Sequence, residues 1–137
     1  MNSFQPCLNL IRTIVVDDHS GFRKVLKRLL SRYPFIEVVG EAQSAEESLD
    51  LIKVLSPDLV TVDVHLPGMN GFELTRILKR DFPRLQTVII SVNGNHFFRQ
   101  EAEQLRCLYV TKESLMDELP PVADILNARF IRISKSS

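Results

Sequence analysis

Five polar residues follow apolar segments of the chain in a pattern that predicts chemistry: Asp17, Asp18, Asp63, Ser91 and Lys112. Carboxylates brought together repel one another, which favours protonation of one of them. A hard divalent cation relieves this repulsion, because Mg²⁺ takes oxygen ligands, keeps several waters and often shares a phosphate. A lysine adds a compact positive charge, and a serine hydroxyl can donate a hydrogen bond to a phosphoryl oxygen. Together these residue types predict phosphoryl transfer in which an aspartate serves as nucleophile.

The strongest candidate for this nucleophile is Asp63, which follows the apolar run at residues 59–62. A continuous run rich in β-branched residues is typical of a strand that is buried on both faces. Pro67, Gly68 and Gly71 then favour a loop. An unpaired buried charge is costly, and ligands of open α/β sheets bind at the carboxyl ends of the strands. Asp63 is therefore predicted to be functional rather than a solvated carboxylate at a strand end.

The hydropathy pattern also predicts the elements that must position these residues. Helices with an apolar face are expected between successive strands, starting near Ser20, at the capping signal Ser44, at Asn70 and, more weakly, at Asn95. A last helix is expected within residues 115–129. Two prolines there, at 120 and 121, predict either a kink or a short turn followed by a helix that begins near residue 121. The strands themselves are predicted at residues 11–16, 36–40, 58–63, 85–90 and 107–110.

This alternation predicts an α/β fold of five βα units whose strands are held parallel by right-handed crossovers. We expect a flavodoxin-like doubly wound sandwich with strand order 2-1-3-4-5. In that order the first and third strands are neighbours, and the fourth and fifth follow outward. The five polar residues would then meet in one crevice at the carboxyl edge of the sheet.

The composition is that of one globular domain, with 137 residues, 45% hydrophobic and 25% charged. Seventeen basic and seventeen acidic residues cancel, which argues against direct nucleic-acid binding through bulk charge. No apolar run approaches the roughly 18 residues of a membrane span, and the first residues lack the features of a secretion signal. Cys7 and Cys107 have no metal or redox spacing. We expect a cytoplasmic protein with an N-terminal extension at residues 1–10, one domain at 11–129 and a tail or linker stub at 130–137.

Four sequence strings, in order and at matching spacing, show that the chain resembles a known family. They are VVDDHS at residues 15–20, TVDVHLPGMNG at 61–71, IIS at 89–91 and YVTK at 109–112. Over residues 11–129 the chain resembles the receiver domain of bacterial two-component response regulators. The first string matches the acidic pair of that family, the second its phosphoacceptor strand and loop, and the last two its switch hydroxyl, aromatic residue and lysine.

The resemblance implies a role for each residue of the pattern. Asp63 would accept a phosphoryl group from a phosphohistidine of a sensor histidine kinase or a phosphotransfer protein. Asp18 and Asp63 would bind Mg²⁺ or Mn²⁺ directly, and Asp17 mainly through water. The backbone carbonyl of His65 would be a further ligand. Lys112 would pair with Asp63 before the transfer and with the phosphoryl group after it.

The resemblance also implies a switch. Ser91 would move toward the phosphoryl oxygen, and Tyr109 would turn inward. This rearrangement would change the face of the fifth strand and so control a partner protein or an output domain outside this chain. It would also permit a homodimer through that face. The chain would then be no enzyme acting on other molecules, but a phosphoacceptor that takes part in its own phosphorylation and slow dephosphorylation.

The sequence departs from the family pattern at three places. Val92 follows the switch hydroxyl where a small residue is usual, which predicts slow self-dephosphorylation because the side chain hinders the attacking water. Glu113 follows Lys112 where the family often has a proline, so the lysine is expected to be less constrained. Leu105 and Arg106 replace the usual Ala-Gly before the fifth strand, which puts the family's usual output-face shape in question for this chain.

Two other function classes fit parts of the pattern. A hydrolase of the haloacid dehalogenase type also uses Mg²⁺ and an aspartate at a strand end, but it generally has a second aspartate where this chain has His65, and it needs a cap. A receiver-like interaction module that is not phosphorylated has the same fold, but such modules usually lose an acidic residue or the lysine. His19 is interpreted as a solvated loop histidine, with a pH-sensitive neighbour of the acidic pair as the alternative. The basic side of the first helix is interpreted as a solvated face, with kinase docking as the alternative: Arg23, Lys24, Lys27, Arg28 and Arg32.

Overall fold

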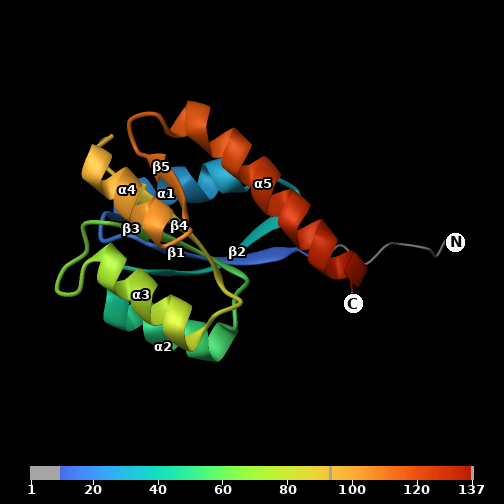
Figure 1. The fold of residues 1–137 in the computed structure, drawn as a ribbon, viewed down its shortest axis with the longest axis horizontal. Coiled ribbons are helices and arrows are strands. Elements are labelled where there is room, and N and C mark those ends of the chain that lie inside the picture. Colours follow the sequence, from blue (N-terminus) through green and yellow to red (C-terminus); the bar gives the residue numbers. More distant parts are fainter. Residues whose placement is uncertain (1–9, 93, 137) are drawn as a thin grey trace, which may run out of the picture.

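One five-stranded parallel sheet organises the structure, a computed structural model that describes residues 10–92 and 94–136, with side chains up to residue 131. Its order, β2-β1-β3-β4-β5, confirms the predicted flavodoxin-like topology (Figure 1). Each strand begins and ends within two residues of its predicted bounds. Residues 1–9, which include Cys7 and most of the predicted extension, lie outside the described part. The strands are β1 (Ile11–Val16), β2 (Ile36–Ala42), β3 (Leu59–Asp63), β4 (Gln86–Ser91) and β5 (Leu108–Thr111).

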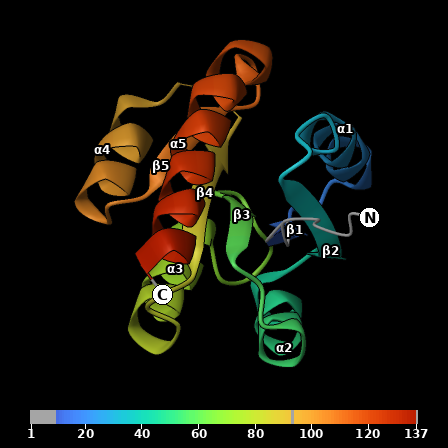
Figure 2. The same ribbon diagram turned by 90° about the vertical axis from the view of Figure 1, so that its right-hand side faces the viewer.

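Helices cover both faces of this sheet. The helices α1 and α5 pack on one face, and α2, α3 and α4 pack on the other, as Figures 1 and 2 show from two sides. Every residue of β3 is buried, as the continuous apolar run predicted. Both faces of β3 are therefore covered, and Asp63 lies at the carboxyl end of this strand. The helices are α1 (Ser20–Leu30), α2 (Ala45–Leu55), α3 (Gly71–Asp81), α4 (His96–Gln104) and α5 (Leu115–Ser136).

The predicted caps set the starts of α2 and α3. Ser44 Oγ accepts a hydrogen bond from the backbone N–H of Glu47 at 3.1 Å. Asn70 Oδ1 accepts one from the N–H of Glu73 at 2.9 Å, and Glu73 Oε1 accepts one from the N–H of Asn70 at 3.3 Å. This reciprocal capping box satisfies two N–H groups that a helix start otherwise leaves unpaired. It fixes the first turn of α3 directly after the loop that follows β3.

The last helix corrects one prediction. The structure has a single helix, α5, that contains both Pro120 and Pro121, so the predicted short turn with a new helix near residue 121 is wrong. The helix also continues beyond residue 129, to Ser136. The prolines lie early in the helix and leave without a donor only the carbonyls of Met116 and Asp117, four residues earlier. Because both of those residues are exposed, water can satisfy these carbonyls.

The end of α4 stores backbone strain at Arg106. The N–H of Arg106 donates to the carbonyl of Glu103 and the N–H of Cys107 to that of Ala102, both at 2.9 Å, which is the Schellman pattern. That pattern places Arg106 at φ 57°, where a Cβ atom is unfavourable. Glycine would adopt this conformation at little cost.

Arg106→Gly is therefore expected to raise the free energy of unfolding by about 0.5–1 kcal/mol, measured by urea denaturation. Arg106→Ala is the matched control, because it removes the exposed charged side chain and keeps the Cβ atom. If alanine stabilised the protein as much as glycine, backbone strain would not be the cause.

Candidate functional site

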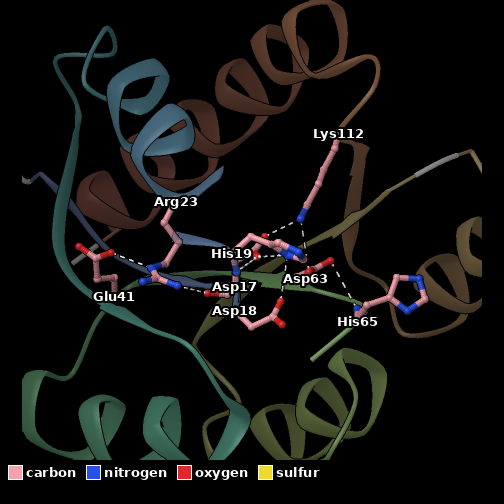
Figure 3. Close-up of polar contacts among 8 residues, drawn as sticks. All are labelled: Asp17, Asp18, His19, Arg23, Glu41, Asp63, His65 and Lys112. Atoms are coloured by element: carbon pink, nitrogen blue, oxygen red, sulfur yellow. Dashed lines mark hydrogen bonds and ion pairs between the residues drawn. The ribbon is translucent and has the colours of Figure 1, made fainter. Parts of the chain in front are cut away.

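The predicted site residues converge because four neighbouring strands, β1, β3, β4 and β5, end at the same edge of the sheet. Val16 of β1 pairs with Val62 of β3, so Asp17 and Asp63 emerge side by side. The N–H of Lys112, just after β5, donates to the carbonyl of Ser91, the last residue of β4, at 2.7 Å. Figure 3 shows Asp17, Asp18, His19, Asp63 and Lys112 turned toward one another at this edge.

Two of the carboxylates are almost completely buried. Asp17 is 2% exposed and Asp63 is 1% exposed, whereas the side chain of Asp18 is 38% exposed. Ligand atoms of Asp17, Asp18, His19 and Asp63 can all lie within 4.8 Å of one another. His19 joins the cluster because its Nδ1 lies 3.1 Å from Asp18 Oδ1, although its side chain is 71% exposed. His19 is thus largely exposed, as expected for a solvated loop residue, and it also neighbours the acidic pair.

Lys112 supplies positive charge between the two buried carboxylates. Its Nζ lies 2.8 Å from Asp17 Oδ2 and 3.4 Å from Asp63 Oδ2. The same Nζ lies 4.2 Å from the centre of the Phe22 ring on α1, a cation–π contact that fixes the direction of the lysine. Two carboxylates and one ammonium group leave a surplus of negative charge.

Burial and this surplus charge both affect the pKa of Asp63. Burial raises the pKa of its carboxyl group above the ordinary value, and the charge of Asp17 raises it further. Lys112 and the backbone N–H of His65, which lies 3.4 Å from Asp63 Oδ1, act in the opposite direction without cancelling the rise. The Asp63 carboxylate therefore lies where an added cation would be stabilising.

The other predicted residues take clear positions around this centre. The hydroxyl groups of Ser91 and Tyr109 are hydrogen-bonded to each other, and both residues are buried. The ring of His65 points away from the carboxylates (Figure 3) and packs against Phe98, with 5.6 Å between ring centres. The backbone N–H of His65 thus faces Asp63, and its imidazole ring does not.

Part of the basic side of α1 supports the site rather than only facing solvent. Arg23 Nη1 donates to the backbone carbonyl of Asp17 at 2.5 Å, and Arg23 Nε bonds Glu41 Oε1 at 2.8 Å. Lys27 Nζ lies 2.5 Å from the other oxygen of Glu41. Hydrogen bonds and charge from Lys27 and Arg23 lower the pKa of Glu41. Figure 3 shows how Arg23 ties β2 to the start of the acidic loop.

The donor set fits Mg²⁺. Asp17, Asp18 and Asp63 present hard oxygen atoms close together, and a cation there would offset the charge that raises the pKa of Asp63. An acidic cluster, a lysine and a buried hydroxyl at one sheet edge are the groups that phosphoryl transfer requires.

Comparison with known proteins identifies the family. The family model of the response regulator receiver domain matches residues 13–123 of the chain. The chain belongs to this family. It is a receiver domain of the two-component response regulators, and its α5 helix continues past the matched region.

Individual relatives agree with this assignment. The response regulator GacA of Pseudomonas aeruginosa is 35% identical over 111 residues, which are 80% of this chain and 52% of that protein. The transcriptional regulatory protein DegU of Brevibacillus brevis is 31% identical over 90 residues, 66% of this chain and 38% of that protein. The receiver thus spans about half or less of the length of these relatives.

Solved structures share the fold. A two-component response regulator of the LuxR family from Aurantimonas has a TM-score of 0.79 and 32% identity, over 87% of this chain and 86% of that one. The isolated receiver domain of RcsB from Salmonella enterica, solved with a phosphomimetic, has a TM-score of 0.82 over 88% of this chain and 90% of that one. Its identity of 23% supports the fold alone. Among the described residues, no helix of this receiver is long and apolar enough to cross a membrane.

Proposed function

We propose that this receiver accepts a phosphoryl group on Asp63 and acts as a phosphorylation switch in a cytoplasmic two-component pathway. The observation that carries the proposal is the position of the Asp63 carboxylate, 1% exposed, beside Asp17 and 3.4 Å from Lys112 Nζ. The donor would be a phosphohistidine of a sensor histidine kinase or of a phosphotransfer protein.

In the transfer, an oxygen of the Asp63 carboxylate attacks phosphorus, and the bond from phosphorus to the donor imidazole nitrogen breaks. The imidazole keeps the electron pair of that bond. Lys112 stabilises the charge on the transferred oxygens, because its ammonium group already lies between Asp63 and Asp17. Bound Mg²⁺ or Mn²⁺ would supply further charge neutralisation at these oxygens.

The ligands of this cation would be Asp18 and Asp63 directly, Asp17 through water, and the backbone carbonyl of His65. The support for this set is the clustering of the three carboxylates and the outward turn of the His65 ring. Asp17 would also keep Lys112 close, through the 2.8 Å contact with Nζ.

The switch would start at Ser91. Its hydroxyl is bonded to that of Tyr109 and would instead donate to a phosphoryl oxygen on Asp63. Exchange of this bond would shift Tyr109 and with it the face formed by α4, β5 and α5. That face would control a partner protein, a second copy of the chain or an output domain.

Intact mass spectrometry after incubation with acetyl phosphate and Mg²⁺ tests the proposal. We expect a gain of one phosphoryl group by the wild type, and no gain by Asp63→Asn or by wild type in EDTA. Asp50→Asn, which changes an exposed aspartate on α2, is the matched control and should gain the group normally. A folded wild-type protein that gains no mass would contradict the proposal and favour an interaction module that works without phosphorylation.

Val92 is predicted to prolong the phosphorylated state. This residue is 51% exposed and lines the hollow above the site together with Asp18 and Lys112. Its methyl groups would hinder a water approaching the phosphoryl group. Val92→Ala is expected to shorten the half-life of phospho-Asp63 severalfold, up to about tenfold. The half-life is measured by loss of the mass adduct, with Val54→Ala on exposed α2 as control, and an unchanged half-life would rule out this role.

A further inference from the structure

The turn that carries Lys112 is held by a residue of the neighbouring helix. Residues 112–114 connect β5 to α5 without belonging to either. Just before them, the N–H and Oγ1 of Thr111 both donate to Glu118 Oε1 on α5, at 2.7 and 2.8 Å. On the far side of the turn, the N–H of Ser114 donates to Thr111 Oγ1 at 3.2 Å. Glu118 thus ties down the residue that precedes the site lysine.

The second oxygen of Glu118 faces another element. Arg99 Nη2 on α4 lies 3.3 Å from Glu118 Oε2, and the Arg99 guanidinium lies 4.8 Å from the centre of the Tyr109 ring. Burial would raise the pKa of Glu118, but the hydrogen bonds from Thr111 and the charge of Arg99 outweigh it and lower this pKa. Glu118 is therefore charged at neutral pH and can hold both partners at once.

These contacts form a connected set that begins and ends at the site. Glu118 holds Thr111, whose successor Lys112 contacts Asp17 and Asp63. Arg99 joins Glu118 to Tyr109, which is bonded to Ser91. Lys112 Nζ contacts Asp17, Asp63 and the ring of Phe22 at the same time, so a displacement of this turn would disturb at least one of these contacts.

We propose that Glu118 is a positioning residue for Lys112 in phosphoryl transfer, and that Arg99 couples this support to the outer face of Tyr109. The inference rests on the proposed function of Asp63. It adds two residues, one on α5 and one on α4, that touch neither the phosphoryl group nor the cation. A displacement of about 1 Å at a reacting group can cost up to about a hundredfold in rate.

The test compares Glu118→Ala, Glu118→Gln and Asp117→Ala in the full chain. Asp117 is an exposed carboxylate in the same turn of α5 and is the matched control for charge near the helix start. Glu118→Gln keeps an oxygen that can accept from Thr111 and loses the charge that attracts Arg99. The rate of phosphorylation by acetyl phosphate, the affinity for Mn²⁺ and the melting temperature are measured for each variant.

We expect Glu118→Ala to phosphorylate about tenfold more slowly than wild type and Asp117→Ala to match wild type. Glu118→Gln is expected to be only about threefold slower, because it keeps the acceptor for Thr111 and loses the charge pair with Arg99. Mn²⁺ affinity is expected not to fall in any of them, because none of these changes removes a proposed metal ligand and a displaced Lys112 would compete less for Asp17 and Asp63. A general structural defect would lower the rate and the Mn²⁺ affinity together. That result, or a normal rate for Glu118→Ala, would overturn the inference.

Arg99→Ala completes the test. It is expected to slow phosphorylation about threefold in the wild type and to have no further effect in Glu118→Ala, since both changes break the same contact, the one between Arg99 and Glu118. Equal effects in both backgrounds would overturn the coupling role of Arg99. Absence of phosphorylation in wild type would refute the proposed function itself, whereas a phosphorylated wild type with unaffected variants would refute only this inference.

Discussion

Gly71→Ala is expected to lower the free energy of unfolding by about 3 kcal/mol and to slow phosphorylation of Asp63 strongly. Gly71 begins α3, and its N–H donates to the carbonyl of Val64 at 2.9 Å. A Cβ atom at Gly71 would lie 2.9 Å from the Cα atom of Val64 and still closer to the carbonyl oxygen of Asp63. Both are backbone atoms, so no side-chain rotation relieves the overlap.

The helix start would have to move away from β3, and the loop behind the phosphoacceptor would move with it. Urea denaturation measures the first effect, and the mass adduct from acetyl phosphate measures the second. Gly21→Ala is the control, because a Cβ atom there meets nothing within 4 Å and Gly21 lies in α1. Alanine at that position is expected to stabilise by about 0.5–1 kcal/mol. Equal effects of the two substitutions would show that the close approach at Gly71 is unimportant.

The sequence was sufficient to predict the fold and the gathering of site residues for a simple reason. Parallel strands end at one edge, so polar residues that follow β1, β3, β4 and β5 meet once the strand order is known. The apolar run before Asp63 and the capping residues Ser44 and Asn70 are local signals, and the structure confirms each of them.

The sequence alone did not predict which side chains of separate helices and strands would contact one another. Arg23 looked like one of several surface cations on α1, and only the lateral packing of α1 against β2 brings it to Glu41 and to the carbonyl of Asp17. In the sequence, Glu118 likewise looks like an ordinary helix residue, and only the packing of α5 beside β5 brings it to Thr111. The absent proline after Lys112 predicted a less constrained lysine, whereas the structure shows its turn held by the Glu118–Thr111 bonds.

In α5, tertiary packing outweighs the low helix propensity of two prolines. Prolines at 120 and 121 disfavour a helix interior by about 3 kcal/mol each on intrinsic scales. The prolines face solvent, whereas buried apolar side chains around them pack the helix against the sheet. These buried residues are Leu115, Leu119, Val122, Ala123 and Leu126. Tertiary burial of this stripe outweighs the local preference.

Lys112→Met is expected to lower the free energy of unfolding by about 3 kcal/mol at pH 7.5 in EDTA. Methionine keeps the unbranched side chain that packs beside Phe22 and removes the charge that lies 2.8 Å from Asp17 and 3.4 Å from Asp63. Those two carboxylates, 2% and 1% exposed, would then face each other without the lysine charge. Lys24→Met, on the exposed side of α1, is the control and should change stability by less than about 0.5 kcal/mol.

The loss should depend on pH with a definite sign. Burial and the charge of Asp17 raise the pKa of Asp63, and Lys112 opposes that rise, so the pKa in the variant is higher still. A carboxyl group whose pKa is raised by folding contributes stability that is fully present below its unfolded pKa and is lost as the pH rises through its folded pKa. The deficit of Lys112→Met relative to wild type is therefore expected to be smaller at pH 5 than at pH 7.5.

A divalent cation should replace the missing charge. Mg²⁺ at about 100 times its dissociation constant stabilises a folded protein by about 2.7 kcal/mol. The folded state gains this free energy because it holds the carboxylates together, whereas the unfolded chain does not. Because the ammonium group no longer competes for Asp17 and Asp63, Mg²⁺ is expected to bind Lys112→Met more tightly than wild type, while phosphorylation remains slow. Urea denaturation with and without Mg²⁺ measures the first effect. A deficit that is the same at both pH values and unchanged by Mg²⁺ would mean that Lys112 stabilises the protein by packing rather than by its charge.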